Sequence, residues 1–177
     1  MYASNSHKKR FKKTLRFLNR HIDPRSSILD LGVKNPLSKL MQDQGHKVEN
    51  TTGEDLDENQ TALITSKAVV VTAFEIIEHL LSPYQILKSI KAQKLVVSVP
   101  LKLWFSSAYR SKIDPLDRHF HEFEDWQLNW LLEKTGWKII ATEKWINPPE
   151  SFGFRSLLRY FVPRHYIVYA EKITPKP

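Results

Sequence analysis

Residues 27–32 are SILDLG, and they indicate the architecture of the chain. Ser27–Leu31 has the length and apolar character of a short buried strand, and Gly32 follows it at once. Asn35 is a favoured N-cap and Pro36 a favoured first helical residue, so a helix is expected directly after the glycine. A strand that passes through a glycine into a helix is typical of the first unit of a parallel α/β sheet.

The rest of the chain continues the alternation of strands and helices. Ala68–Phe74 (AVVVTAF) and Lys94–Val99 (KLVVSV) are apolar without alternation, which predicts strands buried on both faces. Strands joined by helices require crossover connections, so the sequence predicts one α/β domain with a mostly parallel sheet. The other expected strands are 46–51, 137–143 and 165–172. The other expected helices include 11–22, one that starts at Ser82-Pro83 with a capping box of Ser82 and Gln85, one that starts at Glu124, and a short one near Phe154–Phe161.

Length and composition narrow the class of protein. A chain of 177 residues fits a single domain, 1–177, and the absence of cysteine excludes disulfides, thiolate metal sites and cysteine nucleophiles. The longest apolar runs are far too short to span a bilayer, and no apolar segment follows the basic N-terminus as in a signal peptide. A cytoplasmic protein is therefore expected.

The net charge of +8 comes from one segment. Residues 1–20 contain seven Lys and Arg and no acid, which leaves 20 basic residues against 19 acids in the remainder. Phe11, Leu15, Leu18 and Ile22 form an apolar stripe on the same predicted helix. We favour a helix, 1–22, that packs on the sheet with solvated cations over one that docks on nucleic acid or an acidic membrane, although both remain open.

Polar side chains follow three of the predicted strands and form the candidate site. At the first strand, Asp30 can accept a hydrogen bond from an ammonium or orient the loop, and free amides at the helix start favour a negative group. After the strand that ends at Phe74, the segment FEIIEHL presents Glu75, Glu78 and His79. These three either line a cleft or face water while the apolar residues between them pack inward.

The segment 117–123, DRHFHEF, adds two histidines. His119 and His121 could bind a metal, with His79 or Glu122 completing the site, but the sequence offers no third ligand at a regular spacing, so no metal is predicted. A role in accepting a proton is favoured, because imidazole titrates near neutrality.

The order of these motifs resembles that of class I S-adenosylmethionine-dependent methyltransferases. ILDLG, then a buried strand with FEIIEHL, then LVVSVP, RHFHEF and LLEKTGW follow one another over about residues 26–143. The resemblance is nearest to the small-molecule branch, which carries an EHL segment after the fourth strand. It implies a Rossmann-like sheet of seven strands, or of six, with helices on both faces and the last strand antiparallel.

The resemblance also implies a cofactor, S-adenosylmethionine, and roles for individual residues. The residues expected along the cofactor are Asp30, Gly32, Val33, Asp55, Phe74 and Glu75. A base for the acceptor is expected among His79, His119 and His121, with Trp104, Phe105 and Tyr109 as an apolar wall. The implied function is methyl transfer to a small-molecule or lipid-like acceptor.

Two departures from the family's pattern count against full activity and motivate an alternative function. The loop that usually carries three glycines runs from Asp30 to Pro36, and Lys34 and Pro36 replace two of them. The position of the acid that usually ends the second strand falls near Thr52, and the nearest carboxylates are Glu49, Glu54 and Asp55. The interval before the fourth strand is also short, so a helix and the third strand are expected to be trimmed. The alternative is a methyltransferase-fold protein that no longer catalyses and binds a partner.

Overall fold

The strand SILD lies inside a six-stranded sheet in the computed structural model, which describes residues 5–114, 117–146 and 157–173. The strand order is β2-β1-β3-β4-β6-β5. The strands are β1 (Ser27–Asp30), β2 (Lys47–Asn50), β3 (Val70–Phe74), β4 (Lys94–Pro100), β5 (Trp137–Trp145) and β6 (His165–Lys172).

Strand direction confirms a mixed sheet with an antiparallel last strand. β1 pairs in parallel with β2 and β3, and β3 pairs in parallel with β4. β6 is inserted between β4 and β5 and is antiparallel to both. The described residues contain six strands, so the count of seven is not confirmed, and the expected trimming is observed. The stretch 52–60 is polar and rich in acids, and only a five-residue helix, α3 (Thr61–Thr65), separates it from β3.

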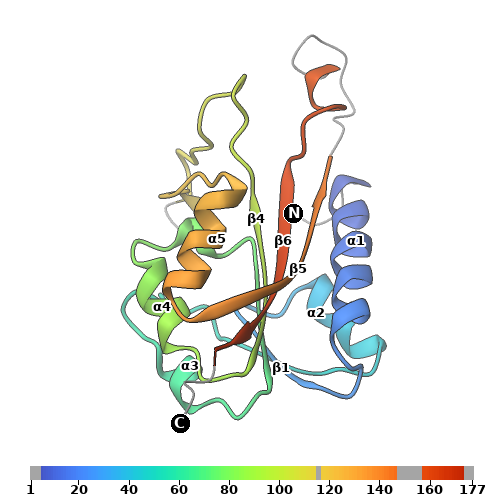
Figure 1. The fold of residues 1–177 in the computed structure, drawn as a ribbon, viewed down its shortest axis with the longest axis vertical. Helices are drawn as coiled ribbons and strands as arrows, with labels where there is room; N and C mark the ends of the chain where they lie inside the picture. The colour runs from blue at the N-terminus through green and yellow to red at the C-terminus, as the bar shows by residue number, and fades with distance from the viewer. Residues whose placement is uncertain (1–4, 115–116, 147–156, 174–177) are drawn as a thin grey trace.

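Helices cover both faces of the sheet, as expected (Figure 1). α1 (Asn5–His21) and α2 (Pro36–Asp43) lie on one face. α3, α4 (Pro83–Ser89) and α5 (Asp125–Lys134) lie on the other, and a 3-10 turn, η1 (Ile77–His79), follows β3. No helix among the described residues is long and apolar enough to cross a membrane.

The N-terminal helix is part of the core. Phe17, Leu18 and Ile22 are at most 2% exposed and pack with β-strand residues such as Val96 and Ile167. The predicted apolar stripe therefore packs on the sheet, and its cations lie around that contact.

The helix starts predicted at Asn35 and at Ser82-Pro83 are both confirmed, but the cap predicted at Ser82 is wrong. The side chain of Asn35 accepts from the amides of Leu37 and Ser38, as an N-cap does. A capping box at Ser82 was expected from the residues Ser82-Pro83-Gln85, but the Ser82 side chain caps nothing. The carboxylate of Asp57 accepts from the amides of Leu81 and Ser82 instead, at 2.7 and 2.8 Å. Of the helix expected near Phe154–Phe161, residues 154–156 lie outside the described residues, 157–158 are helical and 159–161 form a turn.

Candidate active site

The carboxyl ends of β1, β3 and β4 meet at one edge of the sheet. Asp30 is in register with Thr72, and Phe74 with Ser98. Gly32 follows the first of these strands and Glu75 the second. The topology thus brings together the segments that the sequence indicates for a cofactor site.

Asp30 orients the loop, which is one of its two expected roles. Its carboxylate accepts from the hydroxyls of Thr72 and Ser38, at 2.6 and 2.9 Å, and from the amide of Asn50 at 3.0 Å. The residue is only 2% exposed. Burial raises the pKa of Asp30 to about 6, although these three hydrogen bonds oppose the rise. Asp30 thereby joins three strands to α2.

The glycine loop is closed by internal hydrogen bonds. Gly32 has φ +111°, in the region that favours glycine, and its amide donates to Thr51 Oγ1 at 2.7 Å. Pro36 has no amide, and the next two amides of α2 donate to Asn35. The expectation of free helix amides for a negative group is therefore wrong at these positions, because the cap uses them. Lys34, beside this turn, is exposed.

The loops after β1 and β2 touch each other. A Cβ added at Gly53 would lie 2.9 Å from Val33 Cγ1, so only glycine permits this approach. Val33 is 53% exposed at the rim. The carboxylate of Glu54 accepts from the Thr52 amide at 2.7 Å and the Thr52 hydroxyl at 2.8 Å, just beyond β2. Glu54, unlike Asp55, thus folds back toward the end of β2, and its own backbone amide and Thr52 lower the pKa of its carboxyl.

Asp55 has a local structural contact. Its Oδ1 accepts from the amide of Asp57 at 3.0 Å, and its side chain is exposed. Local sequence does not distinguish Glu54 from Asp55, because the fold-back onto Thr52 depends on the turn at Gly53.

Glu75 holds three elements together. Its φ is +56°, rare for a residue with a side chain, and its amide donates to Ser98 O at 2.9 Å. The carboxylate lies 3.1 Å from Arg10 Nη1 on α1 and 3.4 Å from His165 Nδ1 on β6. Burial opposes ionisation, but His165, Arg10 and the Ser98 hydroxyl lower the pKa of Glu75 to about 2. Half-buried Phe74 ends the strand before it.

Glu78 is a buried carboxyl that the sequence left undecided between cleft and solvent. It is 1% exposed, and its Oε2 has no hydrogen-bond partner among the described residues. Burial and the charge of Glu75 raise the pKa of Glu78 well above its usual value. Its backbone carbonyl accepts from the amides of Phe120 and His121, at 2.8 and 3.2 Å. These bonds fasten the DRHFHEF segment to η1.

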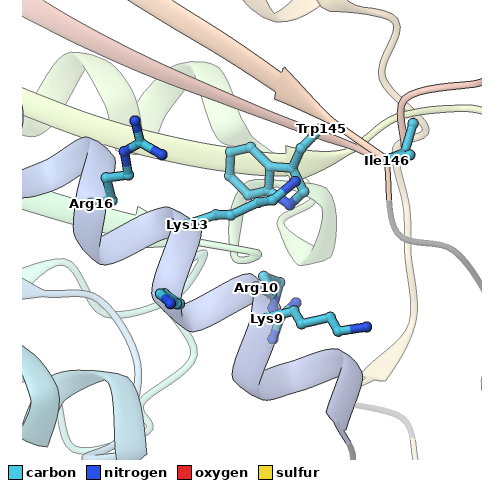
Figure 2. A pocket seen from close by; sticks show the side chains of 7 residues that line it. Lys9, Arg10, Lys13, Arg16, Trp145 and Ile146 are labelled. Atoms are coloured by element: carbon cyan, nitrogen blue, oxygen red, sulfur yellow. The ribbon is translucent and has the colours of Figure 1, made fainter.

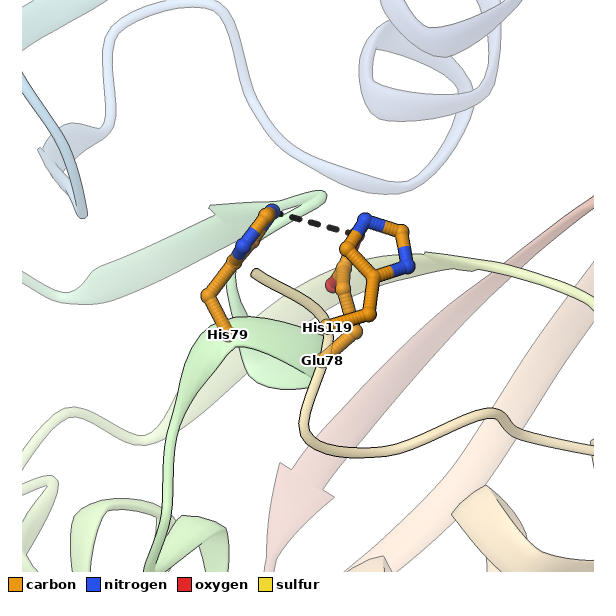
Figure 3. Close-up of side chains that lie close together, drawn as sticks. All are labelled: Glu78, His79 and His119. Carbon is orange, nitrogen blue, oxygen red and sulfur yellow. Dashed lines mark ion pairs between the residues drawn. The ribbon is translucent and has the colours of Figure 1, made fainter. Parts of the chain in front are cut away.

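His79 and His119 come together beside Glu78 (Figure 3). The two imidazole rings meet edge to face with their centroids 4.7 Å apart. His79 Nδ1 lies 3.0 Å from the carbonyl of Arg118, which orients the ring and leaves Nε2 toward Glu78 Oε1, 3.9 Å away. Burial, and then the charges of His79 and Arg164, lower the pKa of His119, so this ring favours its neutral form.

One ligand atom from each of Glu78, His79 and His119 lies within 4.8 Å of the others. Carboxylate oxygen and imidazole nitrogen are ligands that a divalent metal such as zinc accepts, so these residues could hold one. The sequence points to His79 or Glu122 as ligands beside His119 and His121, whereas the fold groups His79 and His119 with Glu78. Only the fold shows that His119 lies beside Glu78 and His79.

His121 and the aromatic residues occupy different surroundings. The His121 ring lies 5.8 Å from that of Phe123, and its Nε2 is buried without a partner among the described residues. The Tyr109 ring contacts His119 at 4.7 Å, and Trp104 meets Phe105 edge to face at 5.3 Å. Trp104 is 75% exposed, so it does not belong to the core.

Solved structures with a similar fold are methyltransferases for the most part. The 1,6-didemethyltoxoflavin-N1-methyltransferase of Burkholderia thailandensis, with its namesake ligand and S-adenosylhomocysteine bound, matches 98% of this chain and 86% of its own at 12% identity and a TM-score of 0.65. An S-adenosylmethionine-dependent methyltransferase of Archaeoglobus fulgidus matches 93% of this chain and 94% of its own, at 17% identity and a TM-score of 0.64. The [4+2]-cyclase SpnF matches 98% of this chain and 84% of its own, at 12% identity and a TM-score of 0.58.

The chain therefore has the fold of class I S-adenosylmethionine-dependent methyltransferases, as its motifs imply. No family model and no curated protein matches its sequence. Because the same fold also occurs in a cyclase, the reaction has to be argued from the site.

Proposed function

We propose that this protein transfers a methyl group from S-adenosylmethionine to a small-molecule acceptor. The observation that carries the proposal is the carboxyl edge of the sheet. There the Gly32 loop and the group of Glu78, His79 and His119 follow neighbouring strands in a methyltransferase fold. One half of this edge suits a nucleoside and the other half suits proton transfer.

The side chains around the Gly32 loop fit the parts of the cofactor. Glu54 offers a carboxylate at the end of β2 that can accept from ribose hydroxyls, so we assign it the role expected of Asp55. Exposed Lys34 can pair with the cofactor's carboxylate, in place of the helix amides that Asn35 uses. Val33 and Phe74 offer apolar contact, while Asp30 acts by fixing the loop.

Bound S-adenosylmethionine supplies an activated methyl group on its sulfonium. The protein's own residues then have to align the acceptor and take up its proton. We assign the proton to His79 or His119, whose rings share one side of the edge, and leave Glu75 as the link to α1 and β6. His121, predicted as a third candidate base, is assigned to packing next to Phe123.

Isothermal titration with S-adenosylhomocysteine and S-adenosylmethionine tests the proposal. We expect one site per chain, and an affinity about tenfold lower in Glu54→Gln, since a carboxylate that accepts from hydroxyls is lost. Glu58→Gln, in the same loop, is the matched control and should bind as the wild type does. No heat with either compound at millimolar concentration would refute the proposal and favour the binding-module alternative.

A further inference from the structure

A groove runs between α1 and the end of β5, outside the edge described above (Figure 2). Its volume is about 440 Å³, which is enough for a small ligand. The residues that line it are Lys9, Arg10, Lys12, Lys13, Arg16, Trp145 and Ile146.

The groove concentrates positive charge that the protein leaves unpaired. Arg10 pairs with Glu75, but the other four cations form no ion pair with any carboxylate in the described part of the chain. Lys9 and Lys13, like Lys12 and Arg16, are four residues apart on a helix, and such like-charged pairs destabilise it. The repulsion among these cations therefore lowers the stability of the protein, and no ion pair among the described residues offsets it.

The indole ring of Trp145 also lines the groove. Trp145 is 5% exposed, and its Nε1 is buried with no hydrogen-bond partner among the described residues. Lys13 Nζ lies 6.0 Å from the centroid of the indole ring. The polar side chains of the groove are thus all donors, so a matching ligand has to bring acceptors and negative charge.

The groove is joined to the candidate site by two contacts. Arg10 lines the groove and reaches Glu75 at 3.1 Å. Trp145 stacks on His165, with centroids 5.7 Å apart, and His165 lies 3.4 Å from the same carboxylate. The groove therefore lies beside the residues that hold Glu75, next to the edge where methyl transfer is proposed.

We propose that this groove binds the diphosphate of the acceptor, which would be a small molecule such as a nucleoside diphosphate or its sugar ester. The inference rests on the proposed function for the acceptor role, but not for the binding itself. Four unpaired cations match the charge of a diphosphate better than that of a single carboxylate. Without the anion they repel one another, so binding also removes that repulsion.

The test is titration with uridine diphosphate, uridine monophosphate and uridine in the absence of S-adenosylmethionine. Binding is measured by calorimetry and by tryptophan fluorescence. Affinity should fall in that order and fall with added salt. Lys13→Gln and Arg16→Gln should each weaken diphosphate binding about tenfold. Lys67→Gln, an exposed lysine just before β3 at the opposite edge, should have no effect.

Equal affinity for uridine and uridine diphosphate, or equal losses in Lys13→Gln and Lys67→Gln, would overturn the proposal. So would vesicles of phosphatidylglycerol, or a uridine oligonucleotide, that bind the protein while free diphosphate at millimolar concentration does not. Because S-adenosylhomocysteine is titrated separately, loss of cofactor binding and loss of diphosphate binding are distinguishable.

Discussion

At the scale of single residues, two carboxyl groups on neighbouring strand ends have opposite properties. Asp30 is enclosed by hydroxyl and amide donors, and burial raises its pKa to about 6. Glu75 is also largely enclosed, but Arg10 and His165 supply charge and lower its pKa to about 2. The two pKa values differ because the partners differ. Neutral hydrogen-bond donors offset the effect of burial on a carboxylate less than cations do.

The pKa of Asp30 predicts a pH dependence of stability. The folded state binds the proton more tightly than the unfolded state, whose ordinary value is 3.8, so stability falls as the pH rises from about 4 to 6. A shift of roughly two pKa units corresponds to about 3 kcal/mol. The advantage in unfolding free energy of wild type over Asp30→Asn should shrink by about that amount between pH 4 and 7 in urea titrations.

Asp43→Asn, at an exposed position of α2, is the control for this comparison and should show no such trend. A difference between wild type and Asp30→Asn that stays constant with pH would contradict the account of Asp30.

The histidines give a second prediction at this scale. The assay measures the transfer of labelled methyl groups from S-adenosylmethionine to the small molecules of a cell extract. His79→Gln or His119→Gln should slow this transfer about 100-fold. Affinity for S-adenosylhomocysteine should stay unchanged, because these rings are assigned to the acceptor side. His121→Gln should keep most of the rate. A loss in His121→Gln as large as in the other two would refute the assignment.

At the scale of elements, α1 has two roles that its sequence shows separately. Its apolar stripe packs on the sheet, and its cations line the groove beside β5. The stripe was predictable from its helical spacing, as were the start of α2 at Asn35 and the strand 165–172. The start of α4 at Pro83 was predictable too, but the carboxylate that caps it was not, because Asp57 lies 25 residues before Ser82.

The packing of α1 can be tested with a matched pair of leucines. Leu18→Ala, at a fully buried position, should lower the free energy of unfolding by about 2–5 kcal/mol. Leu40→Ala on α2, whose leucine is 38% exposed, should cost less than about 1 kcal/mol. Similar losses in urea unfolding would contradict the placement of α1 in the core.

At the scale of the whole molecule, the sequence predicts the layers better than the site. Short apolar runs such as 94–99 predict buried strands, because a continuous apolar run of this length is typical of a strand in a parallel sheet. The order of the motifs indicates the family's fold. The meeting of His79 with His119, and of Arg10 with Glu75, joins segments 40 or more residues apart. Local patterns carry no information on such contacts, so Glu78 and Glu54 gained importance only from the structure.

The measurement that decides the account of the whole molecule is a crystal structure of the protein grown with S-adenosylhomocysteine. We predict density for the nucleoside between the Gly32 loop and Phe74, with the ribose hydroxyls at Glu54 and the carboxylate at Lys34. The thioether sulfur should face His79 and His119. A ligand ordered elsewhere, such as in the groove beside Trp145, or an empty and closed Gly32 loop at saturating concentration, would contradict the account.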